Sequence, residues 1–165
     1  EEGRPPHSVE VVADGGSEME IAREILRKKA GGIQTHGNVK VEVPDLFGRT
    51  IPIRFNRPQF VYLWIRVVLT VGRNLPFPPN YADLVKESLV RQAAGLNVGD
   101  SVFPQKYIGD IYRCVTGVSY VEISTFSTTD PSAASTAYTA GNTPITVRQK
   151  ALVEEKRIEV TVSYV

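Results

Sequence analysis

The sequence predicts an α+β fold in which about three helices pack on a mostly antiparallel sheet. Apolar and polar side chains alternate in residues 39–43 and 51–55, on either side of a turn, which is typical of a β-hairpin. Every second residue from 61 to 71 is aliphatic, which predicts one long strand with a buried face. Apolar residues recur at helical spacing in three further segments, at about 18–30, 80–95 and 104–117.

The first elements are a short strand at Val9–Val12 and a helix. Ser17 followed three residues later by Glu20 is a capping box, which satisfies two backbone amides at a helix start. The helix is therefore expected from Glu18 to Ala30. We expect Gly31 to end it, since glycine commonly follows the last helical turn. A glycine-rich turn should then lead into the hairpin.

The second half contains the long strand, two helices and further strands. The expected elements are a helix after Asn80, a helix from about Pro104 to Gly117, a strand at Val118–Thr125, a short strand at Ile145–Val147 and a last strand from Ile158 to Tyr164. Residues 126–144 are rich in Ser, Thr and Ala without a Lys or Arg, so we expect a long loop there.

The sequence Arg57-Pro58 interrupts the pattern and predicts a boundary between two small lobes. The amino-terminal lobe would be residues 1–57, with the order β-α-β-β. The carboxy-terminal lobe would be residues 58–165, with the order β-α-α-β followed by carboxy-terminal strands.

Composition argues against several classes of function. Nineteen basic and eighteen acidic residues are too balanced to favour nucleic acid or an anionic membrane as a partner. One cysteine and two histidines supply too few ligands for a transition-metal site. No nucleophile stands beside a base in a recognisable motif, and His36 in its turn has no evident catalytic partner. We therefore expect no enzyme activity, no catalytic residues, no metal and no cofactor.

The long strand offers one candidate site, on the side opposite its aliphatic face. Tyr62, Trp64 and Arg66 lie at alternate positions there, and aromatic residues and Arg are enriched at protein–protein contacts. These three residues are our candidates for a subunit contact. A second interpretation is that they pack beneath a neighbouring helix of the same chain. A third is that they form a platform on which a nucleic-acid base or a carbohydrate could stack.

Several short motifs resemble one family when they are taken together and in order. The motifs are a glycine pair leading into a helix, a glycine-rich turn, and a strand ending in Ile-Arg-Phe-x-Arg-Pro. The corresponding residues are Gly15–Gly16, Glu20–Ala22 and Ile25, then Lys29–Asn38, then Gly48 and Ile53–Pro58. This order is similar to that of the baseplate J-like proteins, the wedge components of contractile phage tails and related injection machines.

The resemblance implies a structural function. Such proteins contact copies of themselves and other wedge proteins in a baseplate, during tail assembly and the triggering of sheath contraction. The expected location is the virion, or a phage-tail-like particle, after synthesis in the host cytoplasm, with no membrane or nucleic-acid partner. Family members usually carry a further amino-terminal portion, so this sequence resembles their carboxy-terminal part. The alternative function is a small, non-enzymatic module that binds nucleic acid or carbohydrate through the Tyr62, Trp64 and Arg66 side of the strand.

Overall fold

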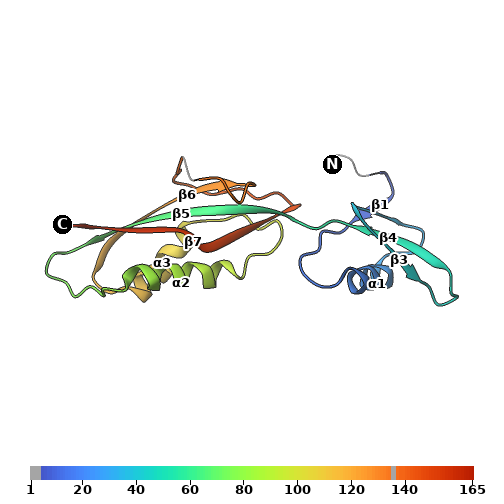
Figure 1. Ribbon diagram of the computed structural model, residues 1–165, viewed down its shortest axis with the longest axis horizontal. Coiled ribbons are helices and arrows are strands. Elements are labelled where there is room, and N and C mark those ends of the chain that lie inside the picture. The colour runs from blue at the N-terminus through green and yellow to red at the C-terminus, as the bar shows by residue number, and fades with distance from the viewer. Residues whose placement is uncertain (1–4, 135–136) are drawn as a thin grey trace. The chain divides into compact units, whose positions relative to one another are not determined.

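The computed structural model describes residues 5–134 and 137–165, and its elements belong to two compact units (Figure 1). The units are Glu1–Pro58 and Gln59–Val165, so the division lies one residue after the expected boundary. Each unit has its own cluster of buried apolar side chains. The α+β class is confirmed.

In its described residues, 5–58, the amino-terminal unit contains one helix and four strands. Its elements are β1 (Ser8–Glu10), α1 (Glu18–Lys28), β2 (Gln34–His36), β3 (Val39–Pro44) and β4 (Thr50–Phe55). The short strands β1 and β2 pair in parallel, and β3 and β4 form the predicted antiparallel hairpin. Ala22 and Ile25 of α1 pack with Val43, Ile53 and Phe55 of the hairpin, so the core of this unit lies between the helix and the hairpin.

The start of α1 is as predicted. The helix begins at Glu18, and the backbone N–H of Glu20 donates a hydrogen bond of 3.3 Å to Oγ of Ser17. The Ser17 hydroxyl in turn donates to the Glu20 carboxylate, with the two oxygens 2.7 Å apart. Ser17 therefore caps the helix by accepting from one backbone amide, and the Glu20 carboxylate bonds to the Ser17 hydroxyl in place of the second amide bond of a full capping box.

The end of α1 was predicted too late. The helix ends at Lys28 rather than at Ala30, before Gly31. The N–H of Lys29 still bonds to the carbonyl of Ile25, but the backbone of Lys29 is extended, so the chain leaves the helix at this residue. A second difference is β2, which forms where only a turn was expected, because its three residues pair with β1.

The carboxy-terminal unit is a three-stranded sheet with two helices on one face. Its elements are β5 (Gln59–Val71), α2 (Tyr81–Ala93), α3 (Gln105–Cys114), β6 (Val118–Thr128) and β7 (Gln149–Tyr164). The strand order is β6-β5-β7, so the long strand is central. Figure 1 shows α2 and α3 on one side of this sheet and the segment that follows β6 on the other side. The aliphatic face of β5 is buried with side chains of both helices, as predicted.

The carboxy-terminal strand pattern differs from the expectation. Residues 145–147 form no strand, and Ile145 is instead buried in the core as a single side chain. The last strand is 16 residues long and begins at Gln149. It pairs with β5 in parallel, whereas β6 pairs with β5 in the antiparallel direction. Strand β6 extends to Thr128, which shortens the expected 126–144 loop at its start, and residues 135 and 136 of that loop lie outside the described residues.

A bulge interrupts the parallel pairing of β5 and β7. The register passes from Val153 to Ile158 on β7 while β5 advances only from Leu63 to Ile65. The four residues 154–157 of β7 therefore lie opposite the single residue Trp64 of β5, which makes three of them additional. A bulge of this kind re-aims side chains next to a sheet, and here it determines what covers the predicted site.

Candidate interaction surfaces

The motif residues of the amino-terminal unit meet in one hydrogen-bonded network. The guanidinium of Arg57 donates from Nη1 to the carbonyl oxygens of Ala13, at 3.2 Å, and Gly15, and from Nη2 to that of Gly16, at 3.0 Å. The same group lies over the ring of Phe55, 5.4 Å from its centre. Arg57, in the Ile-Arg-Phe-x-Arg-Pro motif, thus binds the glycine pair Gly15–Gly16 that precedes the helix, because a guanidinium can donate to several acceptors at once.

The glycine-rich turn joins the same end of the hairpin. Oγ of Thr35 accepts a hydrogen bond of 2.8 Å from the N–H of Arg54, and Oδ1 of Asn56 accepts one of 2.8 Å from the N–H of Asn38. Gly37 is buried against the backbone of Phe55, where a side chain would not fit. In these contacts the motif residues stabilise the fold, which is a structural role.

The predicted face of β5 is covered by the chain itself rather than by a helix. Tyr62 and Trp64 are half-buried, and the guanidinium of Arg157 lies over both rings, 4.7 Å and 5.4 Å from their centres. Arg157 comes from the bulge in β7 and is only 3% exposed. We call the group of Tyr62, Trp64, Arg66 and Arg157 the aromatic face. Sequence reasoning missed Arg157, because a charged run in one strand is usually solvated.

Two further bonds fix Arg157 in this position. Its Nε donates to the carboxylate of Glu154 at 2.8 Å, and Nη2 donates to the backbone carbonyl of Pro131 at 2.9 Å. The side-chain hydrogen bond from Arg157 is the largest cause that lowers the pKa of Glu154 below its ordinary value. Glu154 therefore stays ionised and the bulge is held by a charged pair that also ties down the segment after β6.

Arg66 lies at the more exposed end of the aromatic face. Its Nε donates to the Glu159 carboxylate at 2.8 Å, and its guanidinium lies 4.0 Å from the ring centre of Tyr138. The bond to Glu159 raises the pKa of Arg66 above its ordinary value. Both side chains of this pair are about half exposed. The structure thus brings the three predicted residues together, and a subunit contact through them stays a prediction.

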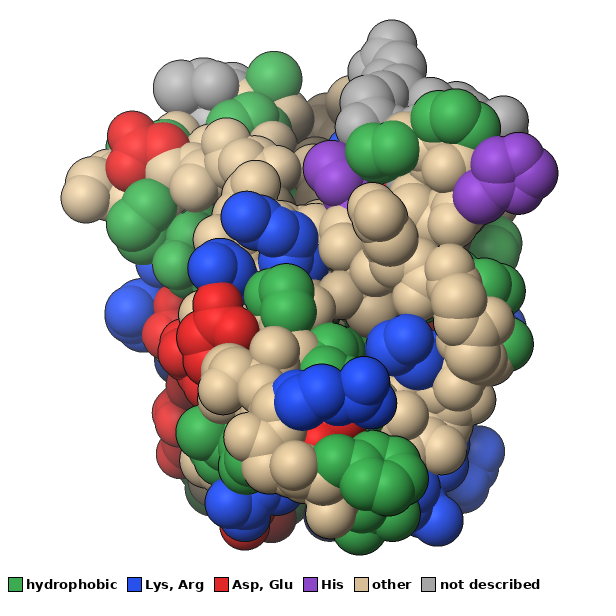
Figure 2. Space-filling model, turned by 90° about the vertical axis from the view of Figure 1, so that its right-hand side faces the viewer, with side chains coloured by type: hydrophobic (Ala, Val, Ile, Leu, Met, Phe, Trp, Pro, Cys, Tyr) green, Lys and Arg blue, Asp and Glu red, His purple; other side chains and the backbone are tan. Residues whose placement is uncertain are grey.

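The turn of the β3–β4 hairpin presents two apolar side chains that sequence reasoning treated only as part of a turn. Leu46 is 100% exposed and Phe47 is 82% exposed. We call these two residues the hairpin tip. Figure 2 looks onto the amino-terminal unit and shows hydrophobic side chains at its surface beside those of Lys and Arg. The available signal was two large apolar residues in a tight turn, where small or polar residues are usual.

The hairpin tip is held by Asp45 at its base. Oδ1 of Asp45 accepts hydrogen bonds of 2.8 Å from the N–H groups of both Phe47 and Arg49, and Oδ2 accepts one of 2.9 Å from Nε of Arg49. Gly48 has φ +76°, a conformation that favours glycine. The turn therefore displays its two apolar side chains from a fixed backbone.

Acidification is expected to loosen this turn. Burial raises the pKa of Asp45, but hydrogen bonds from the Arg49 and Phe47 amides and the Arg49 side chain outweigh it, so the pKa lies below its ordinary value. The stabilising contribution of the carboxylate is therefore full above the unfolded pKa, about 3.9, and is lost as the pH falls through the folded pKa. NMR shifts of the Phe47 and Arg49 amides, followed from pH 6 to pH 2, should report this loss. The same shifts in Asp45→Asn should not titrate in this range, and identical curves for both proteins would contradict the prediction.

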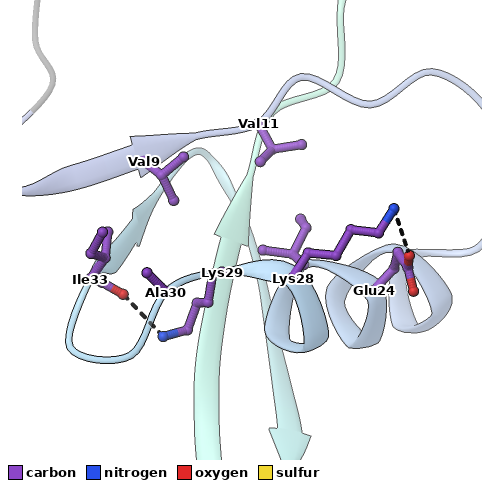
Figure 3. Close-up of a pocket in the computed structure, with 8 residues that line it drawn as sticks. Val9, Val11, Glu24, Lys28, Lys29, Ala30 and Ile33 are labelled. Carbon is purple, nitrogen blue, oxygen red and sulfur yellow. Dashed lines mark hydrogen bonds and ion pairs between the residues drawn. The ribbon is translucent and has the colours of Figure 1, made fainter.

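A groove of about 440 Å³ lies on the amino-terminal unit (Figure 3). Apolar side chains form most of its wall, and charged side chains from α1 and the residue after it stand at its edge. The lining residues are Val9, Val11, Glu24, Ile25, Lys28, Lys29, Ala30 and Ile33. We call this feature the apolar groove. Sequence reasoning did not find it, because the groove depends on how β1 and β2 pack beside the helix.

The described part of the chain offers little for catalysis or metal binding. Among residues 5–134 and 137–165, no group of three or more His, Cys, Asp or Glu side chains could hold a metal ion. No helix in the same residues is long and apolar enough to cross a membrane. Cys114 is half-buried, and burial raises the pKa of its thiol.

A search of protein-family models finds no match to this chain, and a search of curated proteins finds none either.

Proposed function

We propose that this chain is a structural component of a contractile-tail baseplate, similar to the J-like wedge proteins. The observation that carries this proposal is the network centred on Arg57. Arg57 bonds to the carbonyls of the glycine pair, Gly15 and Gly16. The glycine-rich turn meets the end of the same strand through Thr35, Gly37 and Asn38. The motif residues that suggested the resemblance are therefore the residues that hold this unit together, which supports the proposal.

In the proposed function, the chain contributes to assembly of the baseplate through contacts with other proteins. The chain would associate with copies of itself and with other wedge proteins during tail assembly and the triggering of contraction. It would reside in a virion or a phage-tail-like particle, with no membrane partner, no nucleic acid and no cofactor. Exposed apolar side chains on a hydrogen-bonded turn, such as Leu46 and Phe47, suit this work, because exposed apolar surface can mark an interaction site.

The second candidate is a small module that binds nucleic acid or carbohydrate on the aromatic face. A base or sugar ring would have to stack on Tyr62 or Trp64. Arg157 already occupies the space over both rings and is bonded to Glu154 and Pro131. Binding there would require this guanidinium to leave its partners, so we rank the module below the baseplate component.

Removing the gene from the cells that produce this chain tests the proposal. We expect tails without a complete baseplate, because a wedge component nucleates the structure around it. Restoring the gene should restore contractile particles, and mass spectrometry should find the chain in purified particles at a fixed ratio to the sheath protein. Intact, contracting particles from cells without the gene would overturn the proposal.

A further inference from the structure

We propose that a pocket beside β4 binds a carboxylate side chain presented by an acidic, partly aliphatic segment of a partner protein. The pocket has a volume of about 420 Å³ and belongs to the amino-terminal unit. Its lining includes Lys29, Ile33, Thr35, Ile51, Pro52 and Arg54, and we call it the cationic pocket. The inference names the chemistry of one partner in the proposed assembly, and it rests on that function for the presence of such a partner.

Two cations and no acidic residue line the cationic pocket. Lys29 directly follows α1 and Arg54 belongs to β4. Nζ of Lys29 donates to the carbonyl of Ile33 at 3.0 Å (Figure 3). Nη1 of Arg54 reaches the carbonyl of Gly37 only at 3.4 Å. In the part of the chain that the structure describes, neither cation pairs with a carboxylate, so both have N–H donors available for an anionic ligand.

Acidic side chains of the same unit already have cationic partners elsewhere. The pairs are Glu24 with Arg27 and Lys28, Glu42 with Lys40, and Asp45 with Arg49. These carboxylates are therefore engaged, and a carboxylate that pairs with Lys29 and Arg54 would come from another molecule. The planar guanidinium of Arg54 suits such a ligand, because it can donate two parallel hydrogen bonds to one carboxylate.

Apolar side chains beside the cations indicate that the carboxylate has an aliphatic neighbour. Ile33 is 37% exposed, and Ile51 and Pro52 line the same pocket. A segment with an acidic residue next to an aliphatic one would bury apolar surface here and place its carboxylate at the cations. A free inorganic anion would leave this apolar surface in water. The lining therefore favours a protein segment over a small inorganic ion.

The backbone around the pocket also argues against a phosphate group as the ligand. Sites for phosphate commonly combine several backbone N–H groups that converge on the anion. Here the N–H of Ile33 bonds to the carbonyl of Ala30 at 3.4 Å. The N–H of Arg54 bonds to Oγ of Thr35 at 2.8 Å, and Pro52 has no N–H. Recognition is therefore left to the side chains of the two cations.

Titration of the intact chain with short peptides tests the inference. The probe is acetyl-Ile-Glu-Ile-amide, and its neutral match is acetyl-Ile-Gln-Ile-amide. We expect the acidic peptide to shift the amide NMR signals of Thr35 and Arg54 and to bind at least tenfold more tightly than the neutral peptide or inorganic phosphate. Its binding should weaken as salt is raised from about 50 to about 500 mM, because salt screens exposed charges. Absence of binding, equal binding of the two peptides, or tighter binding of phosphate would overturn the inference.

Charge variants show whether the two cations are responsible. Lys29→Met and Arg54→Gln should each weaken binding of the acidic peptide about fivefold, as expected for an exposed ion pair, and the double variant at least tenfold. Lys29→Arg keeps the charge and should retain binding. Arg73→Gln is the matched control, because it removes an exposed cation from the other unit. Hydrogen exchange of β3 and β4 verifies that each variant is folded. A folded double variant that binds as tightly as Arg73→Gln would contradict the proposal.

These measurements use the purified chain alone, so they fail or succeed separately from the proposed function. If the titration fails, the baseplate proposal still stands when mass spectrometry finds the chain in particles. If the particles assemble without the gene, binding of the acidic peptide still shows that the pocket recognises a carboxylate, and only the identity of the partner's assembly is lost.

Discussion

Replacing Gly37 with Ala is expected to unfold the amino-terminal unit and to leave the carboxy-terminal unit folded. A Cβ at this position would lie 2.3 Å from the carbonyl carbon and oxygen of Phe55 and 2.5 Å from its Cα. These are backbone atoms, and Phe55 cannot withdraw, because it pairs with Val39 and its ring is completely buried. The strand would have to separate from the turn, which breaks the network of motif residues.

The expected cost is of the same size as the whole stability of the unit. Mutations that force backbone apart belong to the rare class above about 4 kcal/mol. Domains contribute roughly 0.05–0.15 kcal/mol per residue, which gives about 3–9 kcal/mol for a unit of the size of Glu1–Pro58. The two units have separate buried clusters, so the loss should stay within the first of them.

Hydrogen exchange with mass spectrometry measures both units in the intact chain. In Gly37→Ala, peptides from β3 and β4 should lose protection while peptides from β5 keep it. Gly31→Ala is the matched control, because nothing lies within 4 Å of its Cβ and its φ is not positive. That variant should be neutral or slightly more stable, through a less flexible unfolded chain. Native protection of β4 in Gly37→Ala would show that the turn can move, contrary to the prediction.

Local pattern was enough to predict several elements. The alternation in residues 39–43 and 51–55 fixes the hairpin, because period-two spacing places Val43 and Ile53 on a common buried side. Ser17 and Glu20 locate the start of α1 for a similarly local reason. The end of α1 was less certain, because Lys29 has no sequence feature that forces an extended backbone.

Long-range pairing was not predictable in the same way. Strand β7 pairs in parallel with β5 across about ninety residues of chain, and periodicity carries no information about a partner so distant. The aromatic face depends on that pairing. Tyr62 and Trp64 were identified from their positions in one strand, but Arg157 reaches them only because the bulge of residues 154–157 lies opposite them.

The exposure of the hairpin tip could not be predicted either, for a different reason. Its residues were placed correctly in a turn, but their exposure follows from what does not pack against them, and a single sequence does not contain that information. The apolar groove needs the same three-dimensional knowledge, since Val9 and Ile33 belong to segments about twenty-five residues apart that meet only when β1 pairs with β2.

Replacing Arg157 with Ala is expected to destabilise the carboxy-terminal unit by about 2–4 kcal/mol. The substitution removes a buried guanidinium that lies over two aromatic rings, each contact worth up to about 2 kcal/mol where solvent is excluded. It also removes the hydrogen bond to the carbonyl of Pro131, but Pro131 is an exposed residue whose carbonyl can bond to water instead, so this bond adds only about 0.5–1.5 kcal/mol. Glu154 offsets part of the loss, because it is one-third exposed and keeps Lys156 as a partner at 3.2 Å.

Trp64 provides the measurement, since it is the only tryptophan in the chain. Urea unfolding followed by its fluorescence should give a lower midpoint for Arg157→Ala, with native emission shifted to the red as water reaches the ring. Lys156→Ala is the matched control, because it removes a neighbouring, exposed cation of the same bulge and should change stability by less than about 0.5 kcal/mol. If Arg157→Ala is as stable as this control, the guanidinium contributes nothing to the fold. Tyr62 and Trp64 would then be free to exchange Arg157 for a partner, and the subunit contact predicted for this side of β5 would become the better explanation of why these residues lie together.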